Sequence, residues 1–167
     1  MKINTLLAAG AVCAAAATGA YADTFQKYGE AEGWNVFVDV EKRTCLIETK
    51  DDLDNVVQMG LTEDRSVAYL GVFAKGETDI KKGQKEAVAV MIGENLYVGE
   101  ATGMRGNITK GYSGGYILTD DPRFVEDIAK QHVMTVFPET TYGFSVDLAG
   151  TYKALEMARE CNAKQMQ

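Results

Sequence analysis

Two of the three cysteines, one histidine and a short acidic cluster are the residues of this chain whose chemistry could define a functional site; the third cysteine, Cys13, lies in the N-terminal leader described below. Cys45 and Cys161 lie far apart in the sequence, whereas redox-active dithiols are usually close neighbours, as in Cys-x-x-Cys. Two distant cysteines in an oxidising compartment usually form a structural disulfide. We therefore expect a bridge between Cys45 and Cys161, with redox chemistry as the alternative.

His132 is the single histidine, so a histidine-rich metal site is excluded. A Ser-His-Asp hydrolase of the nucleophile-elbow type would need a Gly-x-Ser-x-Gly turn between a strand and a helix. The nearest match, Tyr-Ser-Gly-Gly-Tyr at residues 112–116, lacks the first glycine. A strand with a glycine bulge or a close approach of two backbones explains this segment better.

Asp51, Asp52 and Asp54 form an acidic cluster that could suggest a calcium site. An EF-hand loop needs a central glycine and a terminal glutamate, and this segment lacks them. A solvated acidic loop is the favoured interpretation. The sequence thus predicts no catalytic residue, no metal site and no cofactor, although a pair of carboxylates for glycoside hydrolysis stays open among the 24 acidic residues.

The first 22 residues have the features of a cleavable signal peptide. Lys2 precedes an uncharged run at residues 6–17, and Ala20 and Ala22 occupy the two positions that a signal peptidase recognises. The run is shorter than the roughly 20 apolar residues that span a bilayer. We expect cleavage after Ala22, a single domain over residues 23–167, and no membrane span in the mature protein.

The charge balance restricts the partners of this domain. The chain has a net charge of −7, and the loss of Lys2 with the signal peptide makes it −8. Nucleic-acid partners are excluded because they require clusters of Lys and Arg, and no basic run is present. Export to a periplasmic or extracellular location also supports the disulfide, which would stabilise the fold by roughly 4 to 5 kcal/mol through closure of a long loop.

Strands with one buried face are indicated by alternation of apolar and polar residues. The acidic stretch at residues 51–55 interrupts this alternation. Without a helix between successive strands, the pattern favours an antiparallel meander. The predicted strands cover residues 34–40, 45–49, 66–74, 86–92, 96–103, 112–119, 133–137 and 142–148.

Two helices complete the prediction. Asp121 followed by Pro122 is typical of a helix start, since the carboxylate can cap the first turn and proline suits its first position. A last helix should begin near residues 149–151 and direct Cys161 toward the sheet. The expected fold is therefore mainly β (α+β): an antiparallel β-sandwich or bent sheet of about eight strands, with a short helix and a C-terminal helix packed on it.

Several segments resemble a known family. They are Trp34-Asn35-Val36, Cys45-Leu46-Ile47, and residues 144–151, which lead into a helix that carries Cys161. Together they resemble small exported alphaproteobacterial proteins related to the invasion-associated locus B family. The resemblance implies a β-rich, non-enzymatic periplasmic or envelope-associated protein, with no catalytic residues to carry over. Members often have more cysteines, and no basic surface is evident here, so a role in invasion is not inferred.

The expected function is that of a non-catalytic periplasmic or envelope-associated binding protein, whose partner is an unknown protein or envelope component. Tyrosine is enriched at interfaces, so four strand tyrosines are candidates for a contact surface, although ordinary strand positions would also explain them. The alternatives are an envelope hydrolase that uses carboxylates or His132, and a carrier of a small apolar ligand with a hollow interior. The four tyrosines are Tyr97, Tyr112, Tyr116 and Tyr142.

Overall fold

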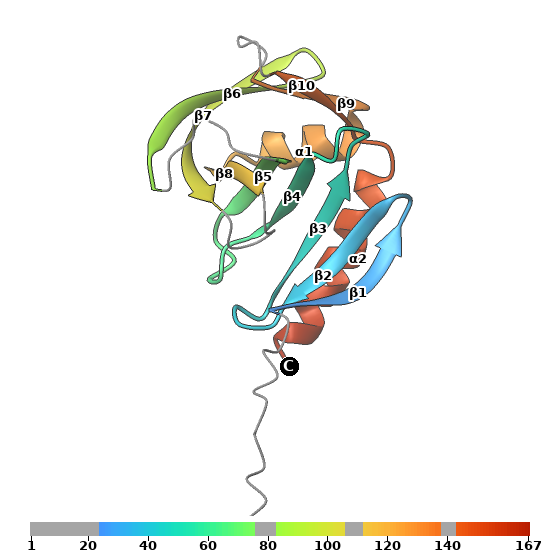
Figure 1. The fold of residues 1–167 in the computed structure, drawn as a ribbon. Helices are drawn as coiled ribbons and strands as arrows, with labels where there is room; N and C mark the ends of the chain where they lie inside the picture. The colour runs from blue at the N-terminus through green and yellow to red at the C-terminus, as the bar shows by residue number, and fades with distance from the viewer. Residues whose placement is uncertain (1–23, 76–82, 106–111, 138–142) are drawn as a thin grey trace, which may run out of the picture.

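The computed structural model describes residues 24–75, 83–105, 112–137 and 143–167, and the predicted signal peptide lies outside them. Within these ranges the chain forms ten strands and two helices (Figure 1). The helices are α1 (Pro122–Lys130) and α2 (Thr151–Gln165), and neither is long and apolar enough to cross a membrane. The strands are β1 (Phe25–Ala31), β2 (Trp34–Asp39), β3 (Thr44–Lys50), β4 (Val56–Leu61), β5 (Ala68–Lys75), β6 (Lys85–Ile92), β7 (Asn95–Arg105), β8 (Tyr112–Thr119), β9 (Val133–Val136) and β10 (Phe144–Asp147).

The strands form one antiparallel sheet with the order β1-β2-β3-β4-β5-β8-β7-β6-β9-β10. The first five strands follow one another as a meander, β6, β7 and β8 form a second meander that runs back toward β5, and only the β5–β6 and β8–β9 connections pass over other strands. The sheet bends around α1, while α2 lies on its first three strands (Figure 1). Of the two predicted architectures, the single bent sheet is the correct one, and the mainly-β fold with a short helix and a C-terminal helix is confirmed.

All eight predicted strands are present, but the prediction missed β1 and β4. Residues 56–59 of β4 are buried without interruption, because both faces of this central strand are covered. Burial on both faces removes the alternation by which a strand is recognised. In β1 the register with β2 shifts between Lys27 and Gly29, which interrupts the alternation there. The strand count of about eight was therefore too low.

The predicted start of α1 is confirmed. The Asp121 carboxylate accepts a hydrogen bond from the Arg123 N–H (2.9 Å) and forms an ion pair with the Arg123 guanidinium (2.8 Å). Pro122 occupies the first helical position, as expected for a residue with a fixed φ and no N–H. Phe124 and Ile128 are buried in the main core, so α1 fills the concave side of the sheet.

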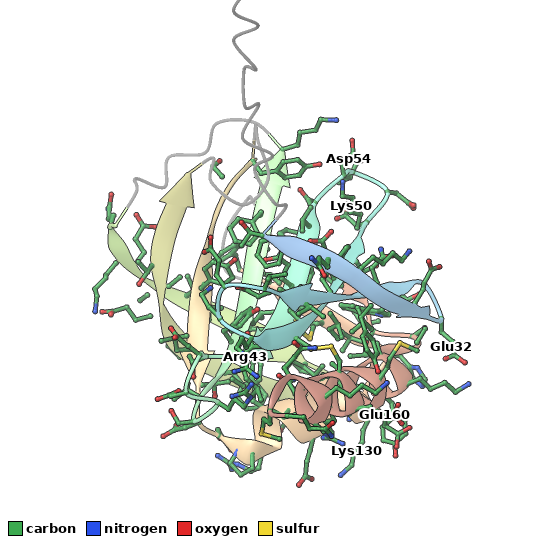
Figure 2. All side chains as sticks on the ribbon, turned by 90° about the horizontal axis from the view of Figure 1, so that it is seen from below. Glu32, Arg43, Lys50, Asp54, Lys130 and Glu160 are labelled. Carbon is green, nitrogen blue, oxygen red and sulfur yellow. A yellow bond between two sulfur atoms is a disulfide. The ribbon has the colours of Figure 1, made fainter. Side chains whose placement is uncertain are left out.

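The helix α2 is attached to the first strands at both ends. Before its first turn, the Trp34 indole N–H donates to the Ala149 carbonyl oxygen (3.0 Å). Gly150 has a φ of +79°, and a Cβ there would lie 2.6 Å from a backbone oxygen of the β1–β2 turn, so glycine is required. At the other end Arg43, labelled beside α2 in Figure 2, donates to the Gln165 carbonyl oxygen (2.6 Å).

The predicted disulfide between Cys45 and Cys161 is confirmed, and both cysteines are buried. Next to it, the Asn162 side-chain oxygen accepts a hydrogen bond from the Cys45 N–H (3.0 Å), and its amide donates to the Ala158 carbonyl oxygen (2.9 Å). Pairing of β3 with β4 begins only at Leu46. The Asn162 amide therefore takes the place of a strand partner for Cys45, which completes the bond between helix and sheet.

The disulfide should contribute several kcal/mol to stability. Replacing Cys45 and Cys161 together with alanine should lower the free energy of unfolding by about 2 to 5 kcal/mol, because a long loop is released in the unfolded chain. Urea unfolding followed by the fluorescence of Trp34 measures this difference. The wild type under reductant is the control and should lose a similar amount. An unchanged unfolding midpoint in both samples would contradict a stabilising bridge.

The Asn162→Ala substitution should cost about 1 to 3 kcal/mol, since it leaves the buried Cys45 N–H without an acceptor. The matched control is Asn95→Ala, which removes an exposed amide that donates to Asp127 (2.8 Å). That variant should lose clearly less stability. Equal losses in the two variants, measured by urea unfolding, would show that Asn162 does not satisfy the backbone of β3.

Candidate functional site

The structure divides the predicted contact tyrosines between two faces of the sheet. Tyr97 on β7 faces α1, where its ring packs edge-to-face on Phe124. Tyr112 and Tyr116 are four residues apart on β8, an even number, so both side chains lie on the opposite face. Tyr142 lies outside the described residues. The structure does not bring the described tyrosines together, and binding through any of them stays a prediction.

Tyr116 is held in a polar and aromatic cluster. Its ring packs edge-to-face on Tyr69 (5.3 Å between centroids) and on Phe73 (5.1 Å). Its hydroxyl donates to the side-chain oxygen of Gln58 (3.0 Å), and the amide of that residue donates to Glu48 (2.7 Å). Burial raises the pKa of Tyr116, with the nearby Glu48 carboxylate as a second cause. The residue thus supports the packing of β4, β5 and β8.

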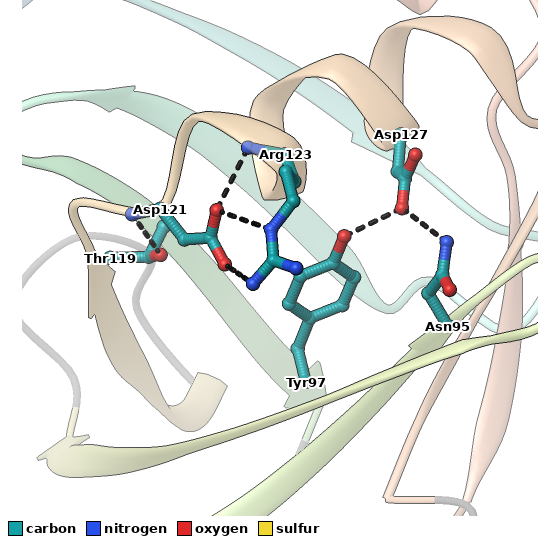
Figure 3. Close-up of polar contacts among 6 residues, drawn as sticks. All are labelled: Asn95, Tyr97, Thr119, Asp121, Arg123 and Asp127. Atoms are coloured by element: carbon teal, nitrogen blue, oxygen red, sulfur yellow. Dashed lines mark hydrogen bonds and ion pairs between the residues drawn. The ribbon is translucent and has the colours of Figure 1, made fainter.

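Tyr97 fastens α1 to the sheet (Figure 3). Its hydroxyl donates to the Asp127 carboxylate (2.5 Å), and Asn95 donates to the same oxygen (2.8 Å). These two hydrogen bonds hold the pKa of Asp127 below its usual value. Desolvation, followed by the bond to Asp127, raises the pKa of Tyr97 to about 12. The arrangement is a structural anchor between β7 and α1.

The residues weighed for catalysis or metal binding do not assemble in the described part of the chain. His132 is exposed between α1 and β9. Asp51 closes the β3–β4 turn, where one oxygen accepts from the N–H groups of Leu53 (2.9 Å) and Asn55 (2.8 Å). Among the described residues, no three His, Cys, Asp or Glu side chains are grouped as a metal site would require. The acidic stretch is therefore a turn that uses its own carboxylate.

A cleft of about 110 Å³ lies between α1, α2 and the β4–β5 hairpin. Its lining includes Met59, Phe124, Leu155, Arg159 and Asn162, and no carboxylate among the described residues contributes to it. The volume is smaller than the roughly 150 Å³ of an apolar cavity that admits benzene. The cleft thus offers neither a pair of acids nor the hollow interior of a carrier.

The most unusual surface lies on the other side of the sheet, away from both helices. Five apolar side chains of β6, β7, β8 and β9 point outward there, and we call them the outer apolar face. Leu96 and Val98 lie opposite Met91 and Ala89 across the β6–β7 pair, so the exposed groups adjoin one another. The five are Met91 (37% exposed), Leu96 (61%), Val98 (72%), Leu118 (57%) and Val133 (50%).

Sequence reasoning missed this face although the signal was present. Residues 96 and 98 are apolar, and Tyr97 between them is apolar as well, so alternation could not tell which side of β7 would be buried. The position of α1 decides it, since Phe124 and Asp127 cover Tyr97. Leu96 and Val98 are thereby turned to solvent.

The rim of the outer apolar face is acidic. At one end Lys85 and Glu100 form an ion pair (2.6 Å). Glu94 in the β6–β7 turn and Asp120 after β8 are exposed and make no ion pair with another described residue. The face therefore combines apolar side chains with two acidic residues at its border that form no ion pair within the described part of the chain.

The Tyr97→Phe substitution should destabilise the fold in a pH-dependent way. Because the pKa of Asp127 is lowered in the folded state, its contribution is present above the unfolded pKa of about 4 and is lost as the pH falls below it. The difference in unfolding free energy between wild type and Tyr97→Phe should thus be larger at pH 7 than at pH 3. Urea unfolding at both pH values measures it.

The matched control is Tyr152→Phe, which removes the exposed hydrogen bond from Tyr152 to Glu156 (2.9 Å) on α2. An exposed pair of this kind contributes little, so this variant should remain close to wild type at both pH values. A Tyr97→Phe difference that grows toward pH 3 would contradict the anchor.

Comparison with protein-family models and with curated protein sequences gives no match. Among solved structures, the chain is similar to the crystal structure of invasion associated protein B from Bartonella henselae, with 17% sequence identity and a TM-score of 0.54. The similarity covers 83% of this chain and 98% of that one. At this identity the likeness concerns the fold, and at that level it confirms the resemblance to the invasion-associated locus B family.

Proposed function

We propose that this chain is a non-catalytic binding protein of the bacterial periplasm or envelope, and that it contacts a protein partner through the outer apolar face. The observation that carries the proposal is the exposure of Leu96, Val98 and Leu118 on a side of the sheet that neither helix covers. The solvent side of an antiparallel sheet is normally polar. Adjoining exposed apolar groups on such a side mark interaction surfaces.

The chemistry of the rim defines the partner. Glu94 and Asp120 carry negative charge without a described counter-ion, and the chain as a whole has a net charge of −7. Complementary charge speeds association and selects among partners. The partner is thus a protein whose contact region is apolar and flanked by Lys or Arg, which also argues against binding to a second, equally acidic copy.

The disulfide between Cys45 and Cys161 supports the location. Such bridges persist in oxidising compartments and are rare in the cytosol. Together with the predicted signal peptide of residues 1–22 and the likeness in fold to invasion associated protein B, it favours the periplasm or envelope.

The described cleft has no carboxylate in its lining, and the hollow that does hold two, Glu63 and Asp64, is an open surface loop without a histidine, which fits a non-catalytic function better than the hydrolase alternative. A hydrolase should place two acids or a histidine at a concave site. A hydrolase screen on glycosides and esters tests this point. Turnover that disappears on His132→Ala, or on replacement of a single acidic residue, would overturn the non-catalytic assignment.

The contact surface can be tested by photo-cross-linking in cells that export the chain. A photoreactive amino acid at position 98 should give discrete adducts, whereas the same residue at position 53 should not, although Leu53 is 75% exposed in the β3–β4 turn. Adding Leu96→Glu should weaken the adduct at position 98 about tenfold, because truncation or charge at an interface centre is costly. The Leu118→Glu substitution should weaken the adduct in the same way.

These variants should keep the wild-type unfolding midpoint, since the replaced side chains are exposed. Equal adducts at positions 98 and 53, or an adduct at 98 that survives Leu96→Glu, would remove the outer apolar face from the proposal.

A further inference from the structure

On the basis of the proposed function, we infer that the partner adds an extended strand to the sheet along the first half of β7. The pairing of β7 with its two neighbours is unequal. It pairs with β6 from Asn95 to Thr102, but with β8 only from Ala101 to Arg105. Residues 95–99 thus have a strand partner on one side only among the described residues, and we call their other side the open edge.

The hydrogen bonds of neighbouring strands show which main-chain groups face the open edge. The Phe137 N–H donates to the Ala89 carbonyl oxygen (2.9 Å), so Ala89 directs its main-chain groups toward β9. Because these groups alternate along a strand, Val90 directs its own toward β7 and its partner Tyr97. The groups of Tyr97 therefore point to β6, and those of Leu96 and Val98 point to the open edge.

A second observation gives the same assignment. The Gly103 N–H donates to the Gln84 carbonyl oxygen (2.8 Å), and the Gly103 oxygen accepts from the Gly83 N–H (2.8 Å), so Gly103 faces the β6 side. Gly103 lies six residues after Tyr97 on β7, an even number, so the main-chain groups of both residues face β6. Neither Leu96 nor Val98 has a main-chain hydrogen bond to a described residue outside the β6–β7 ladder. Among the described residues, the main-chain donors and acceptors of Leu96 and Val98 thus have no partner on the open edge.

The two ends of the sheet are protected, in contrast to the open edge. β1 carries the ion pair of Lys27 with Glu30 (2.9 Å) and a register shift. β10 has only four residues, and its last carboxylate, Asp147, accepts from the Ala149 N–H (2.8 Å). Charges, irregular register and short length are the usual means by which proteins block edge pairing. Only the open edge combines free main-chain groups with exposed leucine and valine among the described strands.

The ligand class follows from these features. Main-chain pairing provides affinity in strand addition, and alternate side chains provide specificity. The added strand should place apolar residues beside Leu96 and Val98, and Lys or Arg near Glu94 and Asp120. In an antiparallel pair of two copies of β7 with Tyr97 opposite Tyr97, Glu94 of one copy would lie opposite Glu100 of the other. Like charges that face each other across strands are destabilising.

Amide hydrogen exchange of the free protein tests the edge itself. The amides of Leu96 and Val98 should exchange about a hundredfold faster than those of Tyr97 and Gly99, which bond to β6. Residue-resolved NMR measures these rates. Equal protection of the two sets would overturn the inference, because the edge would then already be paired.

Binding is tested with a fluorescein-labelled peptide, Lys-Val-Thr-Val-Thr-Val-Lys, and with the same peptide N-methylated at its three valine amides, which would face Leu96 and Val98. The N-methylated form keeps the side chains but cannot pair on one edge, so it should bind at least about tenfold more weakly. In the protein, Val98→Pro should abolish binding, since it blocks the open edge without removing a bond to β6. Val98→Thr, the matched control, should retain it.

The outcomes separate this inference from the proposed function. If both peptides bind equally and Leu96→Glu weakens both, the outer apolar face binds through side chains alone, so the proposed function stands and strand addition is overturned. Lack of binding of the unmodified peptide at about 1 mM also overturns strand addition. The proposed function is tested independently by the cross-linking at position 98. Dimerisation of the chain that Val98→Pro abolishes would replace the partner with a second copy.

Discussion

The constraint on which the rest of this structure depends is the placement of α1 inside the bend of the sheet. Tyr97 holds the helix from β7 through Phe124 and Asp127, and only two residues separate the end of β8 at Thr119 from the start of α1. The chain must therefore leave the sheet beside β7 in order to supply the helix that β7 packs on. β8 cannot follow β7 along its whole length, and residues 95–99 lack a neighbour on that side among the described residues. The open edge is thus a geometric consequence of packing α1 against the concave side.

The same asymmetry explains why the outer apolar face is bare. The described part of the chain has two helices, and both lie on one side of the sheet (Figure 1): α1 in the bend, and α2 on the first strands through Trp34, the Cys45–Cys161 disulfide and Asn162. The opposite side is covered near β4 and β5 by its own aromatic side chains, such as Tyr69 and Tyr116. Beyond β8 that cover ends, and the side chains of β6 and β7 meet solvent.

Much of this fold could be predicted from the sequence, and the failures have physical causes. The pair Asp121-Pro122 marked a helix start because capping is a local interaction. Cys45 and Cys161 could be paired because residues 23–167 contain no other cysteine. β4 was missed because burial of both faces hides the strand period. On α2 the predicted inward position of Cys161 is correct, and the buried line runs through Thr151, Ala154, Ala158 and Cys161. The outer apolar face depends on which side α1 covers, and no local pattern contains that information.

Similarity of fold does not by itself carry function, and here the likeness to invasion associated protein B extends to 17% identity. A function specific to this chain should therefore depend on residues that the fold does not need. Tyr97, Phe124 and Asp127 are needed to place α1, and Asn162 is needed to complete β3. Leu96 and Val98 are not needed in this sense, since polar residues at both positions would fit the same sheet and would protect its edge better. Exposed apolar side chains that the described fold does not need are explained when a partner covers them, and main-chain groups beside them without a described partner favour an extended one.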